Sequence, residues 1–266
     1  MTTNVRFIPT NLADSTSSFT ATSEAGSLVA ANMQRDERAA VCRSTSLAAQ
    51  TYDLRWATAQ SIDSICGAWS NLTSGGTVQA KGYTNVGDGS TVFDETVAPD
   101  TGLNIGNTTF QNWIAAAYNI KQLKIVVTDA ANPAGYVEIS RLCVGKRIEP
   151  VRNAMQQAFR ISLREQFEAK TAESGDLRAE PGWIKRILNM NFAMLEPASR
   201  DLMFDMVFAS RGKGIFVSAF PENSTASTRQ MHAFWGMLVK KQTDFGYPQY
   251  DTWSVEHQIE EMGPTL

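Results

Sequence analysis

The residues best suited to acid–base or metal chemistry are few in this sequence. Only two histidines occur, His232 and His257, and neither has a second histidine, a cysteine or a carboxylate at an interval that forms a recognisable metal site. Histidine titrates near neutral pH, which keeps both residues as candidates for a catalytic or ligand role. Their neighbours favour ordinary packing or a surface position instead.

Three cysteines are the only thiols available for nucleophilic or redox chemistry. Cys42, Cys66 and Cys143 are widely spaced and lie among apolar or strand-like neighbours. This pattern predicts small core residues, and a disulfide between two of them stays an alternative.

Known catalytic motifs are absent from the sequence. It contains no GxSxG, GxGxxG, Walker or HExxH pattern, and Gly212-Lys213-Gly214 is too short to cradle a phosphate and predicts a helix stop. Adjacent carboxylates occur at Asp36-Glu37, Asp94-Glu95 and Glu260-Glu261, where solvated charge is the default. We therefore expect no catalytic residue, no metal, no cofactor and no enzymatic activity, with a hydrolase as the weaker alternative.

The charge pattern restricts the classes of partner. The 24 basic and 27 acidic residues are scattered, which gives a formal net charge of −3 without a block of like charges. Nucleic acids and anionic membranes are captured by concentrated basic fields, so we expect neither as a partner. No apolar run approaches the roughly 20 residues that cross a bilayer, and the first residues lack a secretory pattern. We expect synthesis in a reducing cytoplasm and no membrane insertion.

The first half of the chain has the pattern of short strands between turns. Residues 51–56, 76–83 and 123–128 alternate or concentrate β-branched and aromatic side chains, and Gly-rich or Pro-containing turns separate them. Many short strands predict a sandwich or barrel. Residues 86–109 are expected to form a long surface excursion, and residues 110–118 one or two helical turns.

A boundary at residues 145–150 divides the chain into two expected domains, 1–149 and 150–266. The second begins with clean alternation, which predicts strands with one buried face. A helix is expected between Ser199 and Ala209, because Leu202, Met203, Met206 and Val207 share one face. Further strands are predicted at residues 159–168, 184–192, 215–220 and 252–261.

Two stretches of the first half carry a family resemblance. One combines residues 28–33, 38–44, 52–56 and 62–72; the other combines residues 123–129 with the ending Tyr136-Val137-Glu138-Ile139-Ser140-Arg141-Leu142-Cys143-Val144-Gly145. Together they resemble the galactose-binding-like, discoidin-type domain of phage tail proteins, over about residues 27–148. The resemblance implies a mainly β fold with a jelly-roll β-sandwich, followed by a second β-rich domain with one helix.

The second half resembles the ring-building domain of phage distal-tail and baseplate proteins. The resemblance lies in the strand at 159–168, the helix, Phe220-Pro221, Trp235-Gly236 and the acidic last strand. It implies a virion protein without a cofactor, forming a homo-oligomeric ring, often sixfold, that joins the tail tube to the tip hub. The partners implied are copies of the chain, the tail tube, the hub and other tail-tip proteins.

A carbohydrate-binding module for attachment to a host-surface glycan is the alternative function. Aromatic side chains stack on sugar rings, and Trp69 and Trp113 are the candidate contacts, since the other tryptophans examined lie in strand-like runs that core packing explains. No sugar-binding residue of the resembled family maps onto a matching motif.

Overall fold

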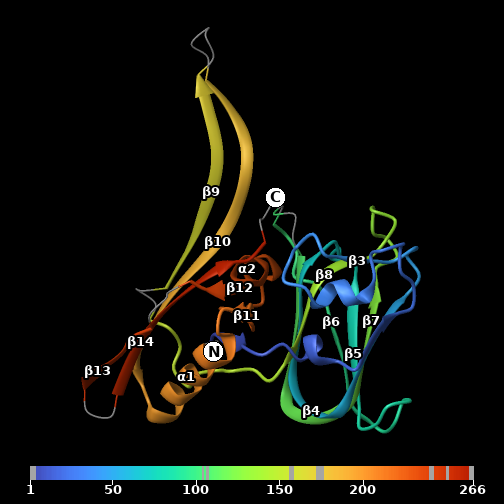
Figure 1. Cartoon of the computed structure of the whole chain (residues 1–266), viewed down its shortest axis with the longest axis horizontal. Helices are drawn as coiled ribbons and strands as arrows, with labels where there is room; N and C mark the ends of the chain where they lie inside the picture. The colour runs from blue at the N-terminus through green and yellow to red at the C-terminus, as the bar shows by residue number, and fades with distance from the viewer. Residues whose placement is uncertain are drawn as a thin grey trace.

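Two antiparallel seven-stranded sheets form two modules that lie side by side (Figure 1). The computed structural model describes residues 4–103, 105, 108–155, 159–171, 177–239, 243–249 and 252–263. We call β2 to β8 the sandwich module, and β1 with β9 to β14 and two helices the C-terminal module. The expectation of a mainly β fold, a sandwich followed by a second β-rich domain, is confirmed.

Two long, bent strands build the sandwich module. β4 and β7 are 21 residues each and pair along their whole length, from Gln50 opposite Val127 to Ser70 opposite Thr108. β2 and β5 flank one half of this pair and β8 flanks the other, so each long strand passes from one layer into the next. The strands are β2 (Ser18–Ala21), β3 (Cys42–Arg43), β4 (Gln50–Ser70), β5 (Thr77–Tyr83), β6 (Thr91–Val97), β7 (Thr108–Thr128) and β8 (Glu138–Gly145).

Alternation of inward and outward side chains explains the core of this sandwich. Tyr52, Leu54 and Trp56 of β4 are at most 2% exposed, whereas the residues between them are half-buried. Phe110 and Leu123 of the paired strand β7 belong to the same core cluster, and both are fully buried. Two short 3-10 helices, η1 (Leu12–Ser15) and η2 (Ala30–Gln34), lie against β8.

The sheet of the C-terminal module has the order β1-β11-β12-β14-β10-β9, with β13 beside β14. Leu188, Met190 and Phe192 of β10 alternate toward its core. The strands are β1 (Arg6–Ile8), β9 (Arg160–Thr171), β10 (Leu177–Leu195), β11 (Ile215–Ser218), β12 (Ala233–Leu238), β13 (Phe245–Gln249) and β14 (Thr252–Glu261).

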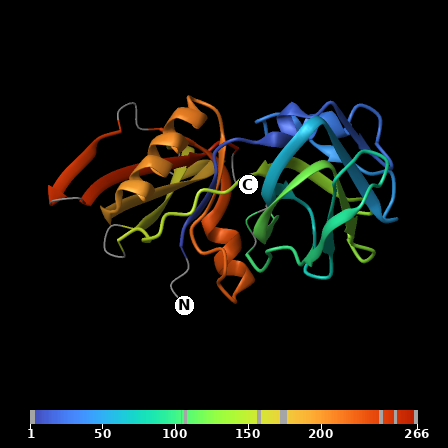
Figure 2. The same cartoon turned by 90° about the horizontal axis from the view of Figure 1, so that it is seen from below.

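Helix α1 (Pro197–Ser210) lies across this sheet, in contact with β10, β12 and β14 (Figure 2). Pro197 begins it, where a missing N–H costs nothing, and Met203 and Met206 are buried beneath it. Arg211 and Gly212 end it with positive φ angles of 31° and 79°, as the predicted helix stop requires. Among the described residues, no helix has the length and apolar character to cross a membrane.

Four expectations from the sequence are corrected by the fold. A second helix, α2 (Ala226–His232), joins the predicted one. Residues 110–118 belong to β7 rather than to helical turns, and the expected surface excursion at 86–109 contains strand β6. β1 pairs with β11, so Arg6–Ile8, assigned to the first domain, contribute a strand to the second sheet.

Gly67 tests the close packing of the sandwich. A Cβ at Gly67 would lie 2.1 Å from the ring of the fully buried Phe110, its cross-strand partner. We predict that Gly67→Ala lowers the free energy of unfolding by about 1–3 kcal/mol, since overpacking displaces the ring. Denaturant unfolding measures this. The control is Gly75→Ala, whose nearest neighbour is 3.8 Å away; equal midpoints for the two variants would contradict the prediction.

Candidate functional site

Both tryptophans predicted to contact a glycan lie between the two modules. Trp69 is 4% exposed, and its indole N–H donates to Oε1 of Glu261 in β14 at 3.2 Å. Trp113 is half-buried, with its ring 6.3 Å from Phe216 and the Arg6 guanidinium 5.5 Å from its centroid. Glycan contact at these residues stays a prediction, and their position gives both rings a packing role.

The two histidines lie apart, among aromatic rings. His232 packs against Phe159 and Phe220, and its Nδ1 lies 2.8 Å from the carbonyl oxygen of Thr228. Burial lowers the pKa of His232. His257 is 1% exposed and its ring lies beside an aromatic ring of β10. Within the described residues, no group of three histidine, cysteine or carboxylate side chains is arranged to hold a metal ion.

The three cysteines are small core residues, as predicted. Cys42, Cys66 and Cys143 are fully buried with free thiols, although Cys66 and Cys143 are direct partners in the β4–β8 ladder. Burial raises the pKa of Cys42 to about 12 and that of the other two as well, which leaves protonated, unreactive thiols.

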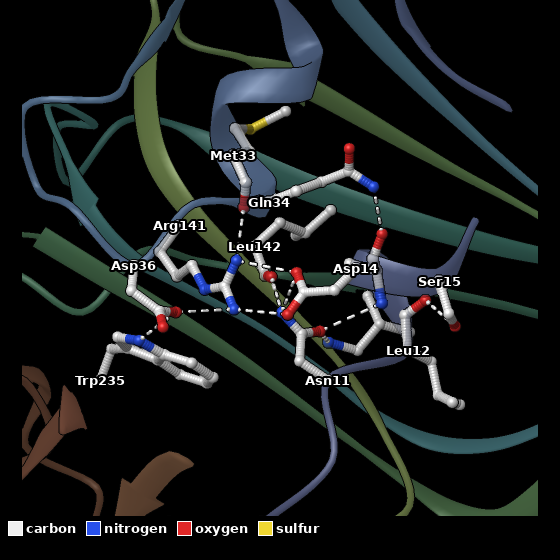
Figure 3. Close-up of polar contacts among 12 residues, drawn as sticks. Asn11, Leu12, Asp14, Ser15, Met33, Gln34, Asp36, Arg141, Leu142 and Trp235 are labelled. Carbon is white, nitrogen blue, oxygen red and sulfur yellow. Dashed lines mark hydrogen bonds and ion pairs between the residues drawn. The ribbon is translucent and has the colours of Figure 1, made fainter. Parts of the chain in front are cut away.

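A buried arginine joins the two modules at the centre of Figure 3. The guanidinium of Arg141 in β8 is 1% exposed and donates to both oxygens of Asp14 at 2.8 and 2.7 Å. It also pairs with Asp36 at 3.1 Å and stacks 4.3 Å from the ring of Trp235 in β12. The Trp235 N–H donates to the same Asp36 oxygen at 3.1 Å. We call these four residues the Arg141 cluster.

Two features around the Arg141 cluster depend on close approach. Burial raises the pKa of the Asp14 carboxyl although Arg141 lowers it, so this acceptor is partly dehydrated. Gly214 permits Trp235 to lie against the backbone, since a Cβ there would be 2.3 Å from the indole. The glycine after the α1 stop therefore has a packing function as well.

A second buried arginine secures the C-terminal sheet to the same junction. Arg186 of β10 donates to both oxygens of Glu261 at 2.9 and 2.7 Å, and their side chains are 3% and 0% exposed. Its remaining amine donates to the backbone carbonyl of Gln230 at 2.7 Å, and the ring of Phe234 lies 4.9 Å away. Because Glu261 also accepts from Trp69, this ion pair reaches into the sandwich module.

Helix α2 adds a third polar contact between the modules. Arg229 donates to Asp100 of the sandwich module at 2.6 Å, and burial raises the pKa of Asp100 against the effect of Arg229. The side chain of Gln230 makes two hydrogen bonds with the backbone of Leu103, at 2.8 and 3.2 Å. Between these contacts lies an apolar cluster of Ile8, Cys66, Ala68, Trp69, Cys143, Phe216, Ala233 and Trp235.

A cleft of about 460 Å³ opens beside the Arg141 cluster. We call it the junction cleft. Asp14 and Asp36 keep 39% and 40% of their side chains exposed in its wall. Residues of both modules line it: Pro9, Thr10, Asn11, Asp14, Ser15, Gln34, Asp36, Arg141, Ala209, Lys213, Gly214 and Trp235.

Sequence reasoning missed this site because its parts are far apart in the chain. Asp36 was interpreted as solvated charge, and Arg141 only as part of a strand. A usable signal existed, since Arg141 is the one charge in the apolar run from Ile139 to Val144, and a charge in a buried strand requires a partner.

Comparisons with known proteins give distant structural likeness only. No family model and no curated protein match the chain. Chitosan-binding module 1 of a chitosanase/glucanase from Paenibacillus sp. IK-5 is 15% identical over 51% of this chain and 98% of its own, with a TM-score of 0.41. The family 32 CBM from C. perfringens NanJ, in complex with galactose, is 17% identical over 51% and 97%, with a TM-score of 0.40.

A Streptococcus pneumoniae fucose-binding module is 11% identical over 52% of this chain and 98% of its own, with a TM-score of 0.39. These identities and scores do not place the chain in a family.

The two buried arginines should differ in their effect on stability. We predict that Arg186→Met costs about 3–5 kcal/mol of unfolding free energy, because it removes the arginine from the charge of the buried Glu261. Arg141→Met should cost less, since Asp14 and Asp36 each reach water. Chemical unfolding of both variants measures the difference. A larger loss for Arg141→Met than for Arg186→Met would contradict this account.

Proposed function

We propose that this chain is a structural protein that assembles with copies of itself through the β9–β10 hairpin. The register of the hairpin runs from Arg160 opposite Asn189 to Thr171 opposite Leu177. β14 pairs with β10 only from Ile187 onward. Within the described residues, the part of β10 before Ile187 therefore forms its ladder with β9 alone, and Figure 1 shows this part projecting from the C-terminal module. We call it the arm.

A two-stranded arm has physical reasons to seek a partner. An isolated hairpin is marginally stable in water, and both of its edges present unpaired N–H and C=O groups. Residues 162–166 of β9 are exposed, including Leu163 at 61%. Addition to the edge of another sheet would pair these backbone groups. The unpaired length of the arm is the observation that carries the proposal.

A second surface of the C-terminal module is also suited to a protein partner. Phe208 of α1 is 58% exposed and Tyr247 of β13 is 53% exposed. Phe204 of α1 stacks on Phe208 and on Phe245 of β13, with ring centroids 6.4 and 4.0 Å apart, and Tyr247 packs on Trp253 at 4.9 Å. Exposed aromatic side chains that gather on one face are typical of interfaces.

The arm and this aromatic face belong to different parts of the module (Figure 1). An arm that binds a different surface of the next copy makes a head-to-tail contact, which closes as a ring if the rotation permits. A sixfold ring between the tail tube and the tip hub of a phage virion is the specific form of this proposal. That form rests on the sequence resemblance alone.

Shortening the arm tests the assembly. In the variant, Asn-Gly replaces residues 166–183 and joins Glu165 to Ile184, which are register partners. We predict that the wild-type chain forms one oligomer of defined mass and that the shortened chain is a monomer, because the pairing edges are lost. Native mass spectrometry and light scattering measure this. A wild-type chain that stays monomeric at its highest soluble concentration would overturn the proposal.

A paired substitution tests the aromatic face. Phe208→Ser should weaken the oligomer, whereas Val86→Ser, which removes an exposed apolar residue from the sandwich module, should leave it intact. Equal dissociation of both variants in a dilution series would show that this face takes no part in assembly.

Attachment to a glycan is the second candidate function, and the junction cleft favours it. The structures that are similar to this chain are modules that bind chitosan, galactose or fucose by their own descriptions. Their likeness is too distant to transfer that property. The support in this chain is a cleft whose two carboxylates remain open to solvent.

A glycan array tests attachment. We predict selective binding of the intact protein to one class of saccharide, which free sugar should inhibit. Trp69→Ala is a poor probe, because removing this buried ring damages the module junction. The absence of any specific signal from the folded wild-type protein would reject this candidate and leave the assembly proposal untouched.

A further inference from the structure

We propose that the junction cleft binds an uncharged, polyhydroxylated ligand, a mono- or disaccharide, held by both modules together. This inference rests on the glycan-attachment candidate and names its site and ligand class. A volume of about 460 Å³ is suited to a ligand of this size. Figure 3 shows the carboxylates of Asp14 and Asp36 on two sides of the Arg141 guanidinium.

The charges around the cleft disfavour an ionic ligand. An anion would meet the exposed carboxylates of Asp14 and Asp36, and Arg141 is 1% exposed and already pairs with both. A cation would require an excess of negative charge, but Arg141 and the exposed Lys213 offset Asp14 and Asp36. The net formal charge of these four side chains is zero. Desolvating an ionic ligand there would bring no compensating pair.

The hydrogen-bonding groups suit hydroxyls. An ionised carboxylate accepts at about four lone-pair sites, and Arg141 does not occupy all of those on Asp14 and Asp36. Lys213 supplies a donor, and the Ser15 hydroxyl, which donates to a backbone carbonyl, still accepts. A hydroxyl both donates and accepts, so one sugar ring can satisfy both kinds of group.

The cleft is held in shape before a ligand enters. Asn11 caps η1 by accepting from the backbone N–H of Ala13, and it also bonds β8 through Leu142 and Val144. The Arg141 cluster then fixes Asp14 and Asp36 from the opposite side. A preorganised site loses little conformational entropy on binding, which favours a small ligand with few contacts.

Two substitutions test the site and leave in place the hydrogen bonds that hold the cleft in shape. Ala209 lies on the last turn of α1 and lines the cleft. In the variant Ala209→Trp, the larger side chain should block the cleft. The matched control is Ala198→Trp on the first turn of the same helix, where the side chain is exposed. Because Ala209 also lines a neighbouring groove, Lys213→Met is the second variant, since Lys213 lines the junction cleft and not that groove.

The probes are free galactose, glucose, mannose, fucose and N-acetylglucosamine, titrated into the full-length protein and followed by NMR. Glucuronate and glucosamine share the glucose ring and differ in charge, so they test the charge argument. We expect at least about tenfold weaker binding of the best neutral sugar in Ala209→Trp, which corresponds to about 1.4 kcal/mol. Lys213→Met should weaken it too, and Ala198→Trp should bind as the wild type does.

The outcomes separate the site from the function. Saccharide binding that survives both Ala209→Trp and Lys213→Met would overturn this site while glycan attachment stands. Binding of glucuronate or glucosamine in preference to the neutral sugars would overturn the ligand class. No binding of any probe, together with a silent glycan array, would overturn both. Unchanged unfolding midpoints of the variants ensure that lost binding reflects the site and not the fold.

Discussion

The structure depends on two buried arginines, each paired with carboxylates of its own module and each in contact, directly or through its carboxylate, with a tryptophan of the other module. Arg141 connects Asp14 and Asp36 of the sandwich module to Trp235, and Arg186 holds Glu261, which in turn accepts from Trp69. Separating the modules would take Trp235 away from Arg141 and Asp36, and Trp69 away from Glu261. Buried polar groups that lose a hydrogen-bond partner are destabilising, so this separation has a large cost. The two modules are therefore expected to move as one body.

The two edges of the second sheet differ in how they are covered. β1 would be an open edge, but Phe7 and Ile148 exchange two backbone hydrogen bonds of 2.9 and 2.8 Å there, so a passing segment covers it. At the other edge lies β9, for which the described residues offer β10 alone. The chain covers the β1 edge and leaves the β9 edge open. An open edge strand can pair with another chain.

Most secondary-structure elements could be predicted from the sequence, whereas the tertiary contacts between them could not. Alternation in β4 and β10 and the shared face of α1 identify local structure, because burial imposes a period of two or about 3.6 residues. β7 was interpreted as helical near Ala115–Ala117, where the long strand bends and three successive alanines face solvent. The three residues of β1 are too short to show a period. Arg141, Asp36 and Trp235 converge only through tertiary structure, so the cleft could not be predicted from their spacing in the chain.

The proposed assembly and the proposed ligand site are compatible because they use different surfaces. The arm projects from the C-terminal module (Figure 1), the aromatic face combines side chains of α1 and β13, and the cleft is lined by residues of both modules. A ring built through the arms would present one cleft per subunit, all held at fixed angles by the contacts between the two modules. Weak binding of a single sugar then becomes strong attachment to a surface that displays many, since each further contact is intramolecular. Rigid pairing at the junction is what would make that gain available.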